Sequence, residues 1–165
     1  KVCVISKGSI ESRPPLLRML SFFCDKGWEF EVFCTGQRDT PAHIVSSISK
    51  SESVKIFHVR EAAGILAKAR PVVEVPALVT ALRSSNRGDW DLVIAYNPYA
   101  LLAGYLAGLG RDEPLVYYSA ELFDARTFWP QRMCERIARG RIGGLIVCQE
   151  DRGQLLKQWL RLDVP

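Results

Sequence analysis

Polar side chains follow an apolar, strand-like run at residues 115–118, and they are the first candidates for chemistry. Ser119, Glu121, Asp124 and Arg126 come there in quick succession. A hydroxyl, two carboxylates and a guanidinium can hydrogen-bond a polar substrate together. Parallel α/β sheets place their chemistry at the carboxyl ends of strands, where this loop would begin. The length of the loop, which runs to Trp129, also favours a functional role.

Two further polar segments follow strand-like runs in the same way. They are Lys7, Gly8 and Ser9, and Tyr96 and Asn97. Gly8 has two compatible interpretations: a turn that needs the conformational freedom of glycine, or backbone N–H groups that face an anion at the start of the next helix. Asn97 is suited to cap a helix whose first residue is the following proline.

Six short apolar runs predict the strands that would position these loops. Several are rich in β-branched and aromatic residues and end at turn residues, which is typical of buried parallel strands. The predicted strands are residues 2–6, 30–34, 54–59, 91–95, 115–118 and 144–148.

Helical periodicity fills most of the gaps between the strands. Proline removes a donor and crowds the preceding turn, so the third gap predicts a helix that starts only at Pro71 or Pro76. The predicted helices are residues 14–26, 42–48 as a short option, 71 or 76 to 85, 98–109, 131–139 and 151–160. Two buried stripes are predicted: Leu101, Leu102, Tyr105, Leu106 and Leu109 before a stop at Gly110, and Leu155, Leu156, Trp159 and Leu160.

The alternation of strands and helices predicts an α/β fold. We expect a Rossmann-like, doubly wound parallel sheet of about six strands with helices on both faces. With the strand order 3-2-1-4-5-6, the sheet reverses direction between the first and fourth strands. The predicted site is the crevice at that point, lined by residues 7–13, 96–99 and 119–129.

Length and composition limit the class of protein. The 165 residues, 48% of them hydrophobic, suffice for one core, so a single domain is expected. A net charge of +4 does not by itself indicate nucleic-acid binding. Five cysteines without CxxC spacing favour reduced, buried thiols in a cytoplasmic protein. Neither a membrane-spanning run nor a signal peptide is recognised, and the strand that starts at Val2 suggests a piece of a longer chain.

Several kinds of chemistry lack their motifs. The sequence has neither the glycine fingerprint of dinucleotide binding nor a phosphate-binding P-loop. His43 and His58 lie far apart and have no partners at ligand spacing, so a metal site or a catalytic triad is not expected. A G-x-S-x-G nucleophile motif is missing too, and no covalent hydrolase chemistry is expected.

Four stretches resemble the N-terminal domain of GT-B glycosyltransferases, in particular family 4. They are residues 18–32, 91–103, 114–123 and 144–150, which together extend over nearly the whole chain. The resemblance implies an acceptor-binding domain whose missing partner, a C-terminal domain, holds most of the nucleotide-sugar donor. It also implies retaining, metal-independent hexosyl transfer to a saccharide or lipid-linked acceptor, without a cofactor, as in polysaccharide biosynthesis. This half alone is then expected to be inactive.

The chain departs from the family pattern at two places. Ala120 stands where members commonly have a histidine before Glu-Leu-Phe, and Tyr96-Asn97 stands where many have His-Asp. A methyl group cannot hydrogen-bond a sugar hydroxyl as an imidazole does. Glu121 fits the family's glutamate and is the one catalytic candidate, with capping or a local salt bridge as its alternative role. The substitution leaves two other functions open: a non-catalytic module that binds a nucleotide or sugar phosphate, and a domain kept for protein interaction.

Arginines repeat along the helix predicted at residues 131–139. Arg132, Arg136 and Arg139 have the spacing of one helical face. Such a face is either solvated or docked on anionic lipid head groups. The second interpretation would make the protein peripheral at the inner face of the membrane.

Overall fold

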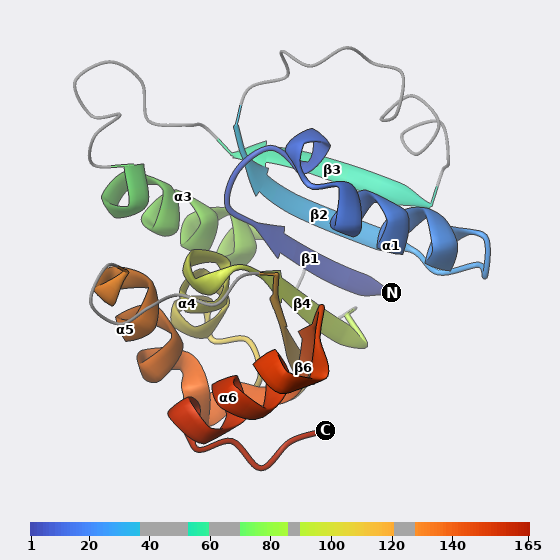
Figure 1. The fold of residues 1–165 in the computed structure, drawn as a ribbon. Coiled ribbons are helices and arrows are strands. Elements are labelled where there is room, and N and C mark those ends of the chain that lie inside the picture. Colours follow the sequence, from blue (N-terminus) through green and yellow to red (C-terminus); the bar gives the residue numbers. More distant parts are fainter. Residues whose placement is uncertain (37–52, 60–69, 86–89, 121–127) are drawn as a thin grey trace.

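A six-stranded parallel sheet forms the centre of the computed structural model, which describes residues 1–36, 53–59, 70–85, 90–120 and 128–165 (Figure 1). The strand order is β3-β2-β1-β4-β5-β6, and all neighbouring strands run parallel. The strands are β1 (Val2–Ser6), β2 (Phe30–Thr35), β3 (Val54–Val59), β4 (Leu92–Tyr96), β5 (Leu115–Ser119) and β6 (Ile142–Val147). The predicted class, strand number and order are confirmed.

Helices connect these strands and cover both faces of the sheet (Figure 1). The α-helices are α1 (Pro14–Cys24), α3 (Arg70–Ser84), α4 (Pro98–Ala107), α5 (Trp129–Ala138) and α6 (Glu150–Leu160), with short 3-10 helices η1 (Ile10–Ser12) and η4 (Arg139–Arg141). α1 packs on one face, and α3 and α4 pack on the other with α5 against α4. The helix option at residues 42–48 lies outside the described residues.

Alternation along the strands divides the core into two clusters. In β1, Cys3 and Ile5 face α3 and α4, whereas Val2 and Val4 face α1. Successive side chains of a strand point to opposite faces, and both faces are covered here, so the strand is apolar throughout. This is why a continuous apolar run, rather than an alternating one, predicts β1 correctly.

The predicted stripe of α4 is partly wrong. Leu101 is buried, but Leu106 is 44% exposed, and the buried positions include Ala100, Ala103 and Gly104. A Cβ at Gly104 would lie 3.2 Å from Ile5 Cδ1, so small residues let this helix approach β1 closely. The helix also ends at Gly108, in the left-handed conformation with φ 95°, rather than at Gly110.

Three other predictions agree with the structure only in part. In α6, Leu156 and Leu160 are buried as expected, but Leu155 and Trp159 are each 42% exposed. Helix α3 includes Pro76, although that residue was a candidate for its start. All five cysteines are free thiols; three are buried, but Cys148 is exposed.

Candidate functional site

Asn97 joins the ends of three strands at the point where the sheet reverses direction. Its backbone N–H donates to the Tyr118 carbonyl at 3.2 Å, and its side-chain Nδ2 donates to the Lys7 carbonyl at 3.1 Å. Lys7 follows β1, Tyr118 lies near the end of β5, and Asn97 follows β4. The three predicted segments therefore meet at one edge of the sheet. For the third segment this covers residues 119 and 120, where the described part of the chain breaks off.

The backbone of Asn97 is strained, with φ 87° and ψ 162°. This is a region that residues other than glycine rarely adopt, and it costs on the order of 1–3 kcal/mol. The side chain offsets part of that cost, because its Oδ1 accepts the Ala100 N–H at 3.0 Å and caps α4. Strained residues of this kind cluster at binding and active sites.

Lys7 lies on the α3 and α4 side of this edge. Its ammonium group is 3.7 Å from Glu74 Oε2 and 4.5 Å from the centre of the Tyr99 ring. The Lys7 side chain is 22% exposed and that of Glu74 only 2%. Burial, with a further contribution from Cys134, raises the pKa of Tyr99 above its usual value. The arrangement presents one cation to solvent above a nearly buried carboxylate.

Arg13 lies on the α1 side of the same edge. Its guanidinium is 5.7 Å from the centre of the Tyr96 ring, which packs edge-on against Tyr118 at 4.9 Å. Burial is the main cause that raises the pKa of Tyr118. A guanidinium within about 6 Å of a ring centre is attracted to the ring, so this side offers a second cation.

Gly8 supports the turn interpretation of its segment. It has φ 96°, and its N–H donates to Thr35 Oγ1 at 2.8 Å. That N–H is therefore already bound to the protein, which contradicts an anion role for it. α1 offers little more, because its first two residues, Pro14 and Pro15, have no N–H.

Ser6 and Gly36 complete the floor of the site. Ser6 Oγ is fully buried at the end of β1 and has no hydrogen-bond partner among the described residues. Buried hydroxyls are normally paired, and this one is closed off from solvent, so it marks the tight packing beneath the end of β1. Gly36 has φ 122°, and a Cβ there would lie 2.9 Å from Ser9 N, so only glycine lets the end of β2 approach the Lys7–Gly8–Ser9 segment.

The remaining predicted site residues divide into two groups. Ser119 is nearly buried and hydrogen-bonds Tyr117, which itself donates to Glu135. Ser119 therefore lies beneath the surface of the site and supports the end of β5. Glu121, Asp124 and Arg126 lie outside the described residues, and their binding roles stay predictions.

Three polar residues at this edge escaped the sequence analysis. Thr35 and Glu74 are described above, and Arg152 of α6 donates from Nη1 to the Ala120 carbonyl at 3.4 Å. Glu74 had a detectable signal, because a single carboxylate within the apolar run of α3 must find a cation or a hydrogen bond. The other two had none, since their contacts depend on the strand order.

A buried acid supports the end of β5. Glu135 accepts hydrogen bonds from the Tyr117 hydroxyl at 2.8 Å and from Arg132 at 2.9 Å, and the Arg132 guanidinium also stacks on Trp159 at 4.3 Å. Burial raises the pKa of Glu135 despite these donors. Burial is also the main cause that raises the pKa of Tyr117. The network fixes α5 and α6 relative to the sheet.

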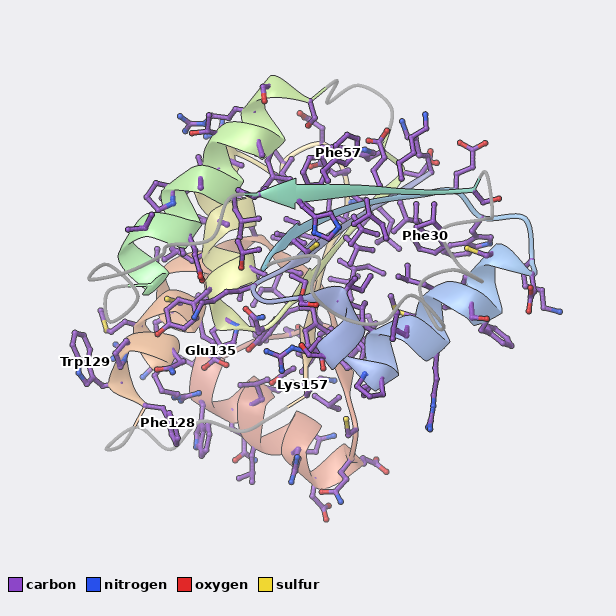
Figure 2. The ribbon with its side chains drawn as sticks, turned by 90° about the horizontal axis from the view of Figure 1, so that it is seen from above. Phe30, Phe57, Phe128, Trp129, Glu135 and Lys157 are labelled. Carbon is purple, nitrogen blue, oxygen red and sulfur yellow. The ribbon has the colours of Figure 1, made fainter. Side chains whose placement is uncertain are left out.

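The predicted arginine face of α5 needs correction. Arg132 is only 13% exposed and is paired with Glu135, so it does not share an open face with Arg136 and Arg139, which are exposed. The outward side of α5 is instead apolar: Trp129 is 64% exposed, and Met133 and Ile137 are also exposed. Figure 2 shows Trp129 pointing away from the body of the protein.

The described ranges contain neither a metal-binding cluster nor a membrane-spanning helix. His58 Nδ1 lies 3.7 Å from Cys34 Sγ, but no group of three potential metal ligands occurs among these residues. Within the same ranges, no helix is both long and apolar enough to cross a bilayer.

Comparison with solved structures finds this fold in several proteins. Sucrose-phosphate synthase from Thermosynechococcus elongatus matches with a TM-score of 0.68 and 14% identity, over 96% of this chain and 45% of that one. Arabidopsis thaliana UGT89C1, complexed with UDP-L-rhamnose, matches with a TM-score of 0.63 and 13% identity, over 90% of this chain and 44% of that one. UDP-GlcNAc 2-epimerase from Neisseria meningitidis, bound to UDP-GlcNAc, matches with a TM-score of 0.62 and 14% identity, over 96% of this chain and 43% of that one.

These similarities define the fold of the chain. No protein-family model matches it, and no curated protein matches its sequence. The chain spans less than half the length of these three solved proteins. It therefore has the Rossmann-like α/β fold found in one part of proteins whose names refer to sugars or sugar nucleotides.

Proposed function

We propose that this chain is the acceptor-binding, N-terminal half of a GT-B glycosyltransferase similar to family 4. The observation that carries the proposal is the convergence of Lys7, Arg13 and the strained Asn97 at the switch point of the sheet. Ligands of open α/β sheets bind at such a crevice. The fold is shared with proteins solved with UDP-sugars, which supports this choice of substrate class.

In this proposal the residues of this half orient the acceptor. Lys7 and Arg13 present donors at this edge, which suits the hydroxyl groups of a sugar. The missing C-terminal domain would hold the nucleotide diphosphate. An acceptor oxygen forms the new bond to the anomeric carbon as the bond to the diphosphate breaks, and its proton leaves to a diphosphate oxygen. Lys7 and Arg13, the cations described at this edge, would also stabilise the charge on that leaving group once the two halves close together.

The experiment compares this chain with the longer chain that the proposal requires. Calorimetry with UDP- and GDP-sugars should give at most millimolar affinity for the 165 residues, about 4 kcal/mol. A nucleotide-release assay should detect turnover for the longer chain only, because positioning and electrostatic stabilisation need both halves. Micromolar donor affinity, or clear turnover by the 165-residue chain, would overturn the proposal.

Ala120 favours a second candidate, a module that binds a nucleotide or sugar phosphate without catalysis. It is a partly buried methyl group at the end of β5, where the family pattern has an imidazole, and Glu121 would be the one catalytic candidate left nearby. Donor binding without turnover by the longer chain, across a panel of acceptors, would favour this second function.

We also propose that α5 contacts an anionic membrane surface. Its exposed side chains Trp129, Met133 and Ile137 recur every four residues, and Arg136 and Arg139 flank them. Apolar side chains beside basic ones suit the boundary between acyl chains and anionic head groups. The proposal retains two of the three arginines that the sequence indicated and adds the apolar side chains between them.

A further inference from the structure

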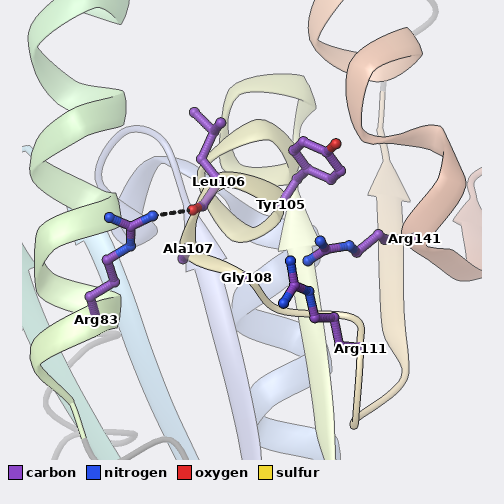
Figure 3. Close-up of a pocket in the computed structure, with 7 residues that line it drawn as sticks. All are labelled: Arg83, Tyr105, Leu106, Ala107, Gly108, Arg111 and Arg141. Carbon is purple, nitrogen blue, oxygen red and sulfur yellow. Dashed lines mark hydrogen bonds between the residues drawn. The ribbon is translucent and has the colours of Figure 1, made fainter.

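A second cavity lies at the opposite edge of the sheet, where α4 ends. It has a volume of about 770 Å³ and is lined by Arg83, Tyr105, Leu106, Ala107, Gly108, Arg111 and Arg141 (Figure 3). Arg83 comes from the last turn of α3, Arg111 from the segment before β5, and Arg141 from the segment before β6. Three guanidinium groups from separate segments thus reach one cavity, and none of its described lining residues is a carboxylate.

Two of these arginines also have a structural role. Arg83 donates to the Leu106 carbonyl at 2.8 Å, and Arg141 donates to the Leu109 carbonyl at 3.1 Å. These carbonyls lie at the carboxyl end of α4, where cations are favourable. Each contact uses one of the five N–H donors of a guanidinium, so most of the donors remain.

Arg111 has no such role. It is exposed, and among the described residues neither a hydrogen bond nor an ion pair engages its side chain. Its acidic neighbour Glu113 instead accepts the Gly110 N–H at 3.2 Å. Figure 3 shows the guanidinium groups of Arg111 and Arg141 pointing into the same part of the cavity.

The charges of this cavity do not balance. The carboxyl end of a helix carries about half a negative charge, against three full positive charges on the arginines. Arg141 also packs over the Tyr105 ring at 4.9 Å, which fixes the orientation of its guanidinium. The adjacent guanidinium groups of Arg141 and Arg111, with Arg83 further along the lining, suit the tetrahedral oxygens of a phosphate, which arginine binds in a bidentate manner.

We propose that this cavity is a binding site for a phosphate group, separate from the crevice at the other edge of the sheet. Besides the arginines and Tyr105, the described lining consists of Leu106, Ala107 and Gly108, so the site would recognise the phosphate rather than a base or a sugar. The phosphate belongs either to a small metabolite or to a lipid head group. This inference is independent of the proposed function.

The experiment titrates the 165-residue chain with sodium pyrophosphate, followed by calorimetry and by the NMR signals of the backbone amides and the arginine Nε–H groups. Arg111→Ala should weaken binding about five- to tenfold, roughly one charge-assisted contact, because it removes a guanidinium and leaves both helix contacts in place. Arg18→Ala is the matched control, since Arg18 is exposed on α1, on the other face of the sheet. It should change the affinity less than about twofold.

A second arm distinguishes the two sources. Vesicles of phosphatidylcholine with and without phosphatidic acid are sedimented with the parent chain and with Arg111→Ala. If the parent chain sediments with the phosphatidic acid vesicles and Arg111→Ala does not, the ligand is a lipid head group. If the parent chain binds pyrophosphate but Arg111→Ala sediments with these vesicles as the parent does, the ligand is a soluble phosphate. Equal pyrophosphate affinity of Arg111→Ala and Arg18→Ala, or signal changes confined to Lys7 and Gly8, would overturn the proposal.

Discussion

Asn97 ties together three strand ends, and its conformation makes it a sensitive probe of the candidate site. Asn97→Ala removes the cap of α4, about 1 kcal/mol, and the hydrogen bond to the Lys7 carbonyl, about 1 kcal/mol. It also leaves alanine at φ 87°. We expect the free energy of unfolding to fall by about 2 kcal/mol or more in urea denaturation.

The matched variant Asn97→Gly loses the same hydrogen bonds but tolerates the backbone conformation. It should therefore be more stable than Asn97→Ala, by more than the preference for glycine over alanine that N-cap positions already show. If Asn97→Ala were as stable as Asn97→Gly, or more stable, the backbone of residue 97 would not be strained.

Arg132 keeps the buried Glu135 carboxylate paired, and this makes stability depend on pH. Arg132→Met retains much of the packing on Trp159 but leaves the acid unpaired, so we expect a loss of about 3 kcal/mol at pH 7. Burial already raises the pKa of Glu135, so this carboxyl binds a proton more tightly in the folded protein than in the unfolded chain. Stability from this group is full below its unfolded pKa, about 4.3, and is lost as pH rises through the folded value.

The pH dependence can be isolated with a second substitution. Removing Arg132 raises the pKa of Glu135 further, so the loss in Arg132→Met should grow as the pH rises above about 4. The double variant Arg132→Met, Glu135→Gln should recover most of the stability at pH 7 and lose that dependence. Thermal unfolding between acidic and neutral pH gives the measurement, and a loss independent of pH would contradict the pairing.

At the scale of elements, α5 has its large apolar side chains outside and an acid inside. For the proposed membrane contact, Met133→Ser with Ile137→Ser should weaken sedimentation with anionic vesicles while the unfolding temperature changes little, because both side chains are exposed. Arg136→Ala and Arg139→Ala should each remove about 1 kcal/mol of attraction, and added salt should reduce their effect.

The control for this element is Phe22→Ser, which removes a side chain that is 58% exposed on α1. It should leave vesicle binding unchanged. Equal binding by the α5 variants and the parent at low salt would mean that the face is simply solvated.

The same helix shows where sequence patterns reach their limit. Its existence follows from periodicity, but burial of Glu135 rather than Met133 depends on Tyr117 and Arg132 being nearby, which only the tertiary structure decides. Likewise, α4 was expected to bury leucines on one side, whereas contact with β1 selects Ala100, Ala103 and Gly104. Strands fare better, because a strand covered on both faces must be apolar throughout.

At the scale of the whole molecule, the sheet separates two polar edges. The parallel α/β class was predictable from the alternation of elements, and the strand order assumed for that class, which the structure has, brings Lys7 and Asn97 together. The contributions of Thr35 and Arg152 were not, because long-range side-chain contacts leave no local pattern, whereas Glu74 could have been found as the single carboxylate in the apolar run of α3. The arginine cavity at the other edge escaped for the same reason, since its three arginines are far apart in the sequence.

The central claim is that the edge formed by the carboxyl ends of the strands binds a sugar acceptor. It is tested most directly by NMR titration of the 165-residue chain with neutral methyl and octyl glycosides, which carry no phosphate to engage the arginine cavity. We predict shifts of the backbone signals of Ser6, Lys7, Asn97 and Ala120, weakened by Lys7→Ala and unchanged by Arg111→Ala. Shifts confined to the residues around Arg83, Arg111 and Arg141 would contradict the claim.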